Sequence, residues 1–288
     1  MKFKNVPKYP EILLKNALFM FSESCYLKTE YKKKTGKKLN LKNPKTFNEW
    51  IQWYKINYRN PLITQAADKA NVRKYVKEKL GSHVLPEIYG IYDKVIDIPF
   101  SEFPEKTVLK CTHGSGWNIF LAAPSEHIIK TTKNQLNQWL SANYYKYGLE
   151  WAYKDIKPQI LAEKYMVDEN GNVPTDYKFF CFHGEPEFIQ VDYDRFINHS
   201  RKIYDINWNA MPFNILYNSP DYSQNPPELL ERMINYARRL SEDFPFVRVD
   251  LYQFNMEVIF GELTFYPGNG MEPFFPGQWD KKVFDFFI

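Results

Sequence analysis

Two carboxylates stand in short, otherwise apolar segments near the end of the sequence. Asp250 and Glu262 each interrupt a run of Val, Ile, Leu and Phe residues that is typical of a strand. A buried carboxylate is costly unless a cation lies beside it, and Mg²⁺ usually binds through one or two carboxylates plus substrate phosphates. Thr264 has the strand spacing that puts its hydroxyl on the face of Glu262. The segments predict a metal site, and the alternative is an ion pair with Arg248 or a nearby lysine.

A lysine interrupts a third apolar segment, which leads directly into a glycine-rich loop. Lys110 precedes Gly114, Ser115 and Gly116, whose backbone N–H groups suit the phosphates of a nucleotide. The loop fits neither the P-loop pattern nor a dinucleotide fingerprint, so an ordinary turn is the alternative. Lys178 repeats the pattern of a lysine in an apolar strand. It is either a second phosphate contact or a lysine on an edge strand.

A polar segment around residues 192–201 is the best candidate for substrate recognition. Arg195 and Arg201 have the planar guanidinium groups that bind a carboxylate through two hydrogen bonds. His199 and Asp194 are placed to contact sugar hydroxyls or an incoming amine. The alternative is a polar hairpin whose charges pair with one another.

The composition predicts a globular, intracellular protein. The chain has 288 residues, of which 44% are hydrophobic and 18% aromatic, enough for a substantial core. Its most apolar stretch, residues 12–21, is interrupted by a lysine and an asparagine, so it predicts neither a membrane span nor a signal peptide. Cys25, Cys111 and Cys181 are odd in number and widely spaced. They favour reduced thiols and a cytoplasmic location.

Positive charge is concentrated at the beginning of the chain. Residues 1–46 contain twelve Lys and three Glu, whereas the remainder contains 26 basic and 31 acidic residues. Such a run is most often a solvated face. The alternatives are contact with an acidic glycan, with an anionic membrane at its inner face, or with nucleic acid. Because no nucleic-acid-binding motif is found, we expect no nucleic-acid partner.

The order of expected elements predicts an α+β protein of two lobes joined near residue 165. Residues 1–60 have a helical pattern, and further helices are expected at about 64–80 and 134–147. Strands are expected at 87–92, 107–111, 160–166, 177–182, 186–191, 200–204, 246–252 and from 259, with a helix at about 227–241. An Asn-Gly pair within 168–172 predicts a hairpin after the strand that ends at 166.

The order of these features resembles the ATP-grasp superfamily, and nearly all residues from about 40 onward resemble its TupA-like branch, found among capsular and teichuronopeptide biosynthesis proteins. The residues that carry the resemblance are 47–53, 67–69, 108–116, 176–181, 248–250 and 261–268. The resemblance implies an ATP-grasp fold in which two α+β lobes clasp ATP. It divides the chain into a helical segment at 1–60, a first lobe at 61–165 and a second lobe with the metal site at 166–288.

The resemblance also implies roles for individual residues. Lys69, Lys110 and Lys178 would contact the phosphates of ATP, with the loop at 114–116 folding over them. Glu163, Lys164, Tyr165 and Met166 would hold adenine, and Asp168 the ribose. Arg248, together with Lys110, would stabilise the transferred phosphoryl group, and Asp250, Glu262 and Thr264 would bind Mg²⁺. Superfamily members usually carry Asn where Thr264 stands, so one or two metal ions remain possible.

The activity implied by this resemblance is an ATP- and Mg²⁺-dependent carboxylate–amine ligase. Such enzymes phosphorylate a carboxylate, and an amine then attacks the acyl phosphate to give an amide. The expected substrates are an amine or amino acid and a uronic-acid-containing cell-surface polysaccharide or its precursor.

Two other functions remain open on the sequence. Asp192, Tyr193 and Asp194 form an Asp-X-Asp motif of the kind that holds a metal and a sugar nucleotide in glycosyltransferases of capsule or O-antigen biosynthesis. That interpretation leaves Lys110 and the paired carboxylates unexplained. A binding protein with a vestigial nucleotide site is the third possibility.

Overall fold

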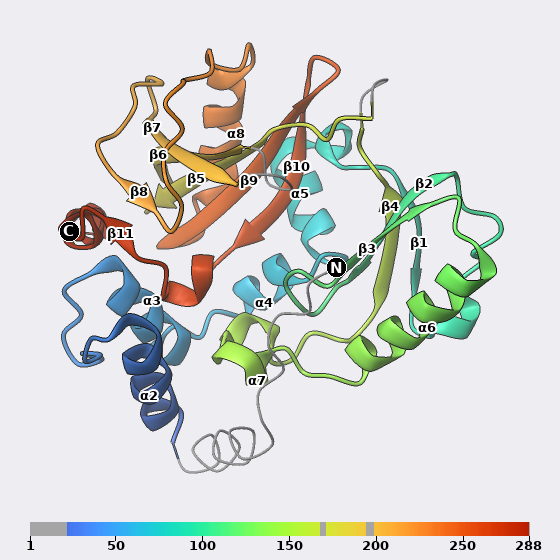
Figure 1. The fold of residues 1–288 in the computed structure, drawn as a ribbon, viewed down its shortest axis with the longest axis horizontal. Coiled ribbons are helices and arrows are strands. Elements are labelled where there is room, and N and C mark those ends of the chain that lie inside the picture. Colours follow the sequence, from blue (N-terminus) through green and yellow to red (C-terminus); the bar gives the residue numbers. More distant parts are fainter. Residues whose placement is uncertain (1–21, 168–170, 194–198, 288) are drawn as a thin grey trace.

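The computed structural model describes residues 22–167, 171–193 and 199–287. Two large antiparallel sheets lie side by side in this part of the chain, with helices packed around and between them (Figure 1). Helices α2 to α9 span Glu23–Thr35, Phe47–Asn57, Pro61–Ala67, Val72–Leu80, Glu126–Leu140, Tyr145–Gly148, Leu230–Ser241 and Trp279–Phe284. Short 3₁₀ helices η1 to η5 span Ser82–Val84, Val95–Asp97, Trp151–Tyr153, Pro267–Gly270 and Asp285–Phe287.

The first sheet has four strands in the order β1-β4-β2-β3. These are β1 Ile88–Tyr92, β2 Lys106–Cys111, β3 Asn118–Ala122 and β4 Ile160–Lys164. Helix α6 covers one face, where Leu136 packs with Leu109, Cys111 and Ile160 of the strands in one buried apolar cluster. The short connection between β2 and β3 contains the glycine-rich loop, so this sheet positions that loop.

The second sheet has five strands in the order β10-β9-β5-β6-β7. These are β5 Asp176–Phe182, β6 Glu185–Tyr193, β7 Ser200–Asp205, β9 Phe246–Phe254 and β10 Glu257–Thr264. Strands β8 Asn214–Ile215 and β11 Phe274–Phe275 form a separate small pair. The sheet packs against α8 on one side and against α3 and the C-terminal elements on the other.

Alternation along these strands decides which side chains meet the helices. Phe180 and Phe182 point to the same face of β5, because side chains two residues apart in a strand share a face. Both lie with Phe246 of β9 around the ring of Phe47 in α3, at centroid distances of 6.2, 6.1 and 5.1 Å. The same face of β9 continues to Arg248 and Asp250. An aromatic core therefore occupies one end of this face and charged residues the other.

The α+β class expected from the sequence is confirmed, whereas some expected elements differ. The helix expected at 64–80 is two helices, because the Asp68 carboxylate accepts hydrogen bonds from the backbone N–H groups of Ala70 and Asn71 and ends α4. The hairpin expected at 168–172 is wrong. Strand β4 pairs with β1 and β2, whereas β5 belongs to the other sheet.

The packing of the N-terminal helices bears on the expected division into segments. Helix α4 contacts β10, and α5 contacts α8, so the residues from 61 to 80 pack on the second sheet. The strands of the first sheet come from residues 88–164 and those of the second from 176–264. The boundaries at 60 and 165 stay a prediction. Within the described residues, none of the helices has both the length and the apolar character needed to cross a bilayer.

Candidate functional site

The two predicted carboxylates lie opposite each other on neighbouring strands. Glu262 of β10 pairs with Asp250 of β9, and the register of the two strands shifts by one residue between Phe260 and Glu262. Gly261 stands at this bulge, where an added Cβ would lie 2.9 Å from the backbone oxygen of Asp250. Without the shift, Glu262 would point to the opposite face of the sheet. The bulge therefore brings both acids, and Thr264, onto one face.

Arg248 joins these groups through its guanidinium. Its Nε and Nη2 donate hydrogen bonds of 2.7 Å each to the two carboxylate oxygens of Asp250. Nη2 also lies 3.3 Å from Glu262 Oε1 and 3.1 Å from Thr264 Oγ1, and the Thr264 hydroxyl donates to Glu262 at 2.8 Å. The ion pair that the sequence left open as the alternative is thus present, and Asp250 and Glu262, the predicted metal ligands, form it with Arg248.

The neighbouring cations keep the Glu262 carboxylate ionised. Burial raises the pKa of this carboxyl, but Arg248 first, and then Lys69 and Lys178, lower it to about 2. Burial also acts on Arg248, yet Asp250 raises the pKa of its guanidinium above the ordinary value. Both groups are therefore ionised at neutral pH.

The donor set fits Mg²⁺. Asp250, Glu262 and Thr264 offer two carboxylates and a hydroxyl on one face, and hard cations of this size bind oxygen ligands. Among the residues that the structure describes, no group of three or more His, Cys, Asp and Glu side chains is placed to hold a metal by itself. A cation here would depend on phosphate oxygens for its remaining ligands, as Mg²⁺ in nucleotide sites does.

Lys178 lies deeper in the same face of the second sheet. Its ammonium is paired with Asp176 and lies 3.3 Å from Asp250 Oδ2 and 4.0 Å from Asp192 Oδ2. The side chain is buried. Strand β5 is central in the sheet, so the alternative of an edge-strand lysine is wrong. Lys178 links the metal-site acids to the neighbouring strand β6.

Lys69 connects the glycine-rich loop of the first sheet to the acids of the second. Its ammonium is hydrogen bonded to the carbonyl oxygen of Gly114, and its backbone N–H donates to Thr112 at 3.3 Å. Burial lowers the pKa of Lys69, and its charged neighbours include both Glu262 and Lys110. The loop and the paired carboxylates, which are about 150 residues apart in sequence, therefore meet at one place.

Two positions of this loop require glycine, each for a different structural reason. A Cβ on Gly114 would lie 2.7 Å from the ring of Trp117, and Gly116 has φ of 73°. Ser115 and Gly116 are exposed at the tip of the loop. Among the described residues, none accepts a hydrogen bond from the backbone N–H groups of Ser115 and Gly116. These groups are therefore accessible to a ligand.

The predicted adenine-binding segment spans the last two residues of β4 and the two residues after it. Glu163 is buried and its carboxylate pairs with Lys110. Lys164 is exposed and lies 3.7 Å from Glu87, while the Tyr165 ring packs on Phe120. Met166 is partly buried. Asp168, predicted to hold the ribose, lies outside the described residues. These nucleotide contacts stay predictions.

The predicted substrate segment is described only in part. Asp194 and Arg195 lie outside the described residues. Arg201 is 6% exposed, and its guanidinium donates to Asp192 at 2.6 Å and to Glu272 at 3.2 Å. His199 lies 3.1 Å from Asp192. The substrate contacts of these residues stay predictions, and Arg201 already has two carboxylate partners within the protein.

The same contacts bear on the glycosyltransferase alternative. Asp192 is buried, with Arg201 and His199 at Oδ1 and Gln190 at Oδ2. Its pKa is lowered below the usual range, because the attraction of Arg201 and Lys178 outweighs burial. Both oxygens of Asp192 are engaged inside the sheet. Asp250 is engaged by Arg248 in the same way, and Asp194, the other acid of the motif, lies outside the described residues, so the glycosyltransferase alternative stays a prediction.

Other buried polar residues beside the site were missed by the sequence analysis. Lys55 in α3 donates to Gln52 Oε1 at 3.0 Å, to the Asn269 carbonyl at 2.9 Å, and to the side chain of Asn269. Glu150 lies buried in the turn after α7. A lysine on the apolar face of an amphipathic helix, and an acid between Leu149 and Trp151, were the available signals.

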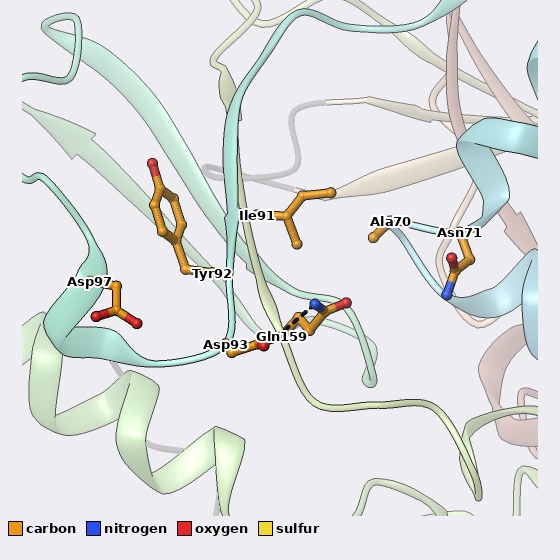
Figure 2. Close-up of a pocket in the computed structure, with 7 residues that line it drawn as sticks. All are labelled: Ala70, Asn71, Ile91, Tyr92, Asp93, Asp97 and Gln159. Carbon is orange, nitrogen blue, oxygen red and sulfur yellow. Dashed lines mark hydrogen bonds between the residues drawn. The ribbon is translucent and has the colours of Figure 1, made fainter.

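A separate surface cavity of about 520 Å³ lies beside β1 and the turn between α4 and α5. Figure 2 shows its lining, including Asp93, whose carboxylate accepts a hydrogen bond of 2.8 Å from Gln159. Ala70 and Asn71 form the side nearest Lys69 in the chain. None of the predicted metal ligands or phosphate-binding residues lines it, so it is distinct from the site described above.

The fold and this meeting of lysines, glycine-rich loop and paired acids define an ATP-grasp protein. The model of the TupA-like ATP-grasp family matches residues 49–288, and the chain belongs to this family. The resemblance found in the sequence is thereby confirmed. No curated protein gives a significant match.

Solved structures with a similar arrangement are distant in sequence. D-alanine–D-alanine ligase from Bacillus anthracis complexed with ATP has a TM-score of 0.46 and 14% identity, over 77% of this chain and 64% of that chain. The ATP-grasp ligase PsnB complexed with minimal precursor has a TM-score of 0.40 and 8% identity, over 76% and 59%. The ADP complex of purK, N5-carboxyaminoimidazole ribonucleotide synthetase, has a TM-score of 0.41 and 14% identity, over 75% of this chain and 50% of that chain. The chain thus spans half to two thirds of their lengths.

Removing the two acids should have the same effect on activity and different effects on stability. If Asp250 and Glu262 bind the metal as predicted, Asp250→Asn and Glu262→Gln should each lower ATP-dependent turnover at least about 100-fold, because each would remove one ligand. Asp250→Asn should also cost about 3 kcal/mol of unfolding free energy, since it leaves Arg248 and Lys178 buried without their shared partner. The Glu262 side chain is 41% exposed, so Glu262→Gln should lower the unfolding free energy by about 1 kcal/mol or less.

Urea denaturation and ADP release measure these two effects. Glu257→Gln is the matched control, because this exposed glutamate lies at the other end of β10. Normal turnover in either acid variant would contradict the metal assignment. Equal losses of unfolding free energy in Asp250→Asn and Glu262→Gln would contradict the larger stabilising role assigned to the more deeply buried Asp250.

The lowered pKa of Glu262 predicts how its contribution to stability depends on pH. The folded pKa of about 2 lies below the ordinary value of about 4.3, so the contribution is complete above about pH 5. It is lost as the pH falls from about 5 to 2. The stability difference between wild type and Glu262→Gln, measured by urea denaturation with a metal chelator present, should shrink over this window. A difference that is constant from pH 6 to 2 would contradict the assigned ion pair.

Proposed function

We propose that this protein is an ATP- and Mg²⁺-dependent ligase that joins a carboxylate to an amine. The observation that carries the proposal is the position of Lys69, which binds the glycine-rich loop and faces both Lys110 and Glu262. Cations for phosphates therefore lie next to oxygen ligands for a metal. This is the arrangement that phosphoryl transfer from a nucleotide needs.

The residues of the site divide the work of this reaction. Lys69 and Lys110 bind the phosphates of ATP, and the exposed tip of the loop at Ser115 and Gly116 covers them. Arg248 stabilises the negative charge of the transferred phosphoryl group, since its guanidinium stays protonated. Asp250 and Glu262, with Thr264, would hold Mg²⁺, which neutralises charge on the phosphate oxygens when bound.

The reaction needs no nucleophilic side chain from the protein. The substrate carboxylate takes the γ-phosphoryl group of ATP, and the resulting acyl phosphate is attacked by the amine. The two buried cysteines are consistent with this, because burial raises the pKa of the Cys111 thiol to about 12 and that of the Cys181 thiol further. Neither is a thiolate at neutral pH, so neither supports a covalent thioester route.

The nucleotide part of the proposal predicts a thermal shift and ADP release. Unfolding of the wild type should move to higher temperature with Mg²⁺ and ATP, since a ligand at about 100 times its Kd contributes about 2.7 kcal/mol. ADP release should require both a carboxylate and an amine, screened as mixed pools of uronates and amines. Lys69→Met should weaken nucleotide binding at least about tenfold, because it removes a phosphate contact.

Lys157→Met is the control for this substitution. Lys157 is an exposed lysine that pairs with Asp93 at 2.8 Å, outside the site. A thermal shift with a sugar nucleotide and none with ATP would contradict the ligase proposal and favour the glycosyltransferase. ATP binding without ADP release under any pair of substrates would favour a binding protein.

The acceptor that we propose is an acidic, uronic-acid-bearing polysaccharide or its precursor, and the basic N-terminal region supports this choice. Eight lysines between residues 28 and 45 are exposed: Lys28, Lys32, Lys33, Lys34, Lys37, Lys38, Lys42 and Lys45. The Glu49 carboxylate beside this region accepts hydrogen bonds from the backbone N–H groups of Asn40 and Lys45. The other substrate is an amine or amino acid.

A membrane surface is the competing partner for these lysines. An amphipathic peripheral helix inserts apolar side chains between lipids in addition to presenting positive charge. Between residues 22 and 46, within the described part of the chain, no large hydrophobic side chain is exposed. Tyr26, Leu27 and Tyr31 instead pack on Tyr145 and Leu149. The exposed lysines therefore suit a hydrated polyanion better than a bilayer.

The lysine surface predicts salt-sensitive binding of a polyuronate. The triple variant Lys28→Gln, Lys32→Gln and Lys33→Gln should bind polygalacturonate at least about tenfold more weakly than wild type at low salt, with a smaller salt dependence. The matched control replaces Lys74, Lys77 and Lys130, which are exposed on other helices. Equal loss in both triple variants, or binding to anionic vesicles alone, would contradict the proposed acceptor.

A further inference from the structure

Aromatic side chains from three segments gather beside the glycine-rich loop. Trp117, at the end of the loop, lies parallel to Trp139 of α6, with 5.9 Å between the ring centroids. Two tyrosines make T-shaped contacts with the same indole, Tyr144 directly before α7 at 5.3 Å and Tyr147 of α7 at 6.1 Å. A residue of the loop is therefore the centre of an aromatic group that α6 and α7 complete.

Backbone and ring contacts fasten this group to the loop. The backbone oxygen of Trp117 accepts a hydrogen bond of 3.0 Å from the N–H group of Cys111, which closes the base of the loop. The Trp117 ring lies so close to Gly114 that an added Cβ would be 2.7 Å away. Nε2 of His113 lies 2.9 Å from the backbone oxygen of Trp139. The rings consequently have a defined position relative to the loop tip.

Tyr147 is the outermost ring of the group. It is 63% exposed, whereas Trp117, Trp139 and Tyr144 are partly buried. A single exposed aromatic residue is common on protein surfaces and by itself indicates no ligand. Tyr147 differs because Trp117 connects it to the glycine-rich loop on one side, and helix α2 packs against it on the other.

Helix α2 brings the lysine surface to the same place. The Tyr26 hydroxyl donates a hydrogen bond of 3.4 Å to the backbone oxygen of Tyr147, and the Tyr145 hydroxyl is hydrogen bonded to Glu23. Helix α7 therefore lies between α2 and α6 (Figure 1). Four lysines of the lysine surface belong to α2, and all four are exposed. Positive charge and the exposed ring are thus neighbours.

The charged residues around α7 extend this positive surface. Lys146 in α7 and Lys154 after it are exposed, and the Lys154 ammonium lies 5.4 Å from the centroid of the Tyr145 ring. Asp155 is the exposed acid within residues 141–157. The third exposed lysine there, Lys157, is paired with Asp93. A polyanion that lies on α2 therefore meets further cations as it approaches Tyr147.

We propose that Tyr147, backed by Trp117, binds one sugar ring of the acidic polysaccharide that the lysine surface holds. The proposal rests on the ligase function and the uronic-acid-bearing acceptor proposed above. A uronate ring has a face of C–H groups that packs on an aromatic ring, while its hydroxyls and carboxylate lie around the rim. An exposed tyrosine beside lysines is complementary to both parts of such a sugar.

This subsite would give the polysaccharide a register. Lysines recognise charge, so they alone would hold a polyuronate in many registers. A ring packed on Tyr147 fixes one of them, and Trp117 directly precedes β3 and follows Gly116 at the exposed loop tip. In the proposed reaction this tip covers the phosphates of ATP. A uronate next to the bound ring would therefore present its carboxylate to the γ-phosphoryl group.

A polyanion without sugar rings separates ring packing from charge. Tyr147→Ala should bind polygalacturonate about tenfold more weakly than wild type, and by the same factor at low and high salt, because ring packing is not screened. Its binding of poly-L-glutamate, which has carboxylates and no rings, should change less than about twofold. Tyr147→Phe should bind both polymers like wild type, since it keeps the ring. Isothermal titration calorimetry without nucleotide measures these affinities.

Met256→Ala is the matched control, because Met256 is 60% exposed and lies in the turn between β9 and β10. It should bind both polymers like wild type. The inference is overturned if Tyr147→Ala loses affinity for both polymers equally or for neither. A loss in Tyr147→Phe or Met256→Ala as large as that in Tyr147→Ala would also overturn it.

The ligase proposal fails on a different result. Tyr147→Ala should keep the wild-type thermal shift with Mg²⁺ and ATP, since the subsite contacts the acceptor alone. Absence of that shift and of ADP release in the wild type would contradict the ligase function, whatever the polymers do. A wild type that shows the shift but binds poly-L-glutamate as tightly as polygalacturonate would contradict the sugar subsite and leave the ligase function standing.

Discussion

Between Phe260 and Glu262 the pairing of β10 with β9 shifts by one residue, and the face of every later side chain on β10 changes with it. Glu262 and Thr264 consequently meet Asp250 and Arg248 on one face of the sheet. Gly261 permits the shift, because any larger residue would press on the backbone oxygen of Asp250. The meeting of Glu262 and Thr264 with Asp250 and Arg248, and with it the predicted metal site, depends on this single irregularity.

The acids and cations that gather there are stable only as a group. Asp250 accepts from Arg248 and lies 3.3 Å from Lys178, which in turn lies between Asp176 and Asp192. In a weakly screened interior each charge is costly alone and favourable beside its partners. The aromatic core around Phe47 occupies the same sheet face, so the helices that bury it also fix the charged end. Stability and chemistry therefore share one surface.

The site is completed across the two sheets, since neither sheet contains it alone. Lys69 binds the loop of the first sheet, and its charged neighbours include Glu262 of the second. This division explains how a ligand held by the loop would meet the metal ligands. It also explains why α3 matters, because Lys55 anchors the turn that follows β10.

The sequence by itself determined the strands that carry Lys110, Asp250 and Glu262, because apolar periodicity and the cost of a buried charge are local signals. It also determined the family, through motifs spread along the chain. Only the tertiary structure decided that Glu163 pairs with Lys110 and that β4 and β5 belong to different sheets. Those facts depend on register and on contacts between distant segments, which residue type and spacing do not encode.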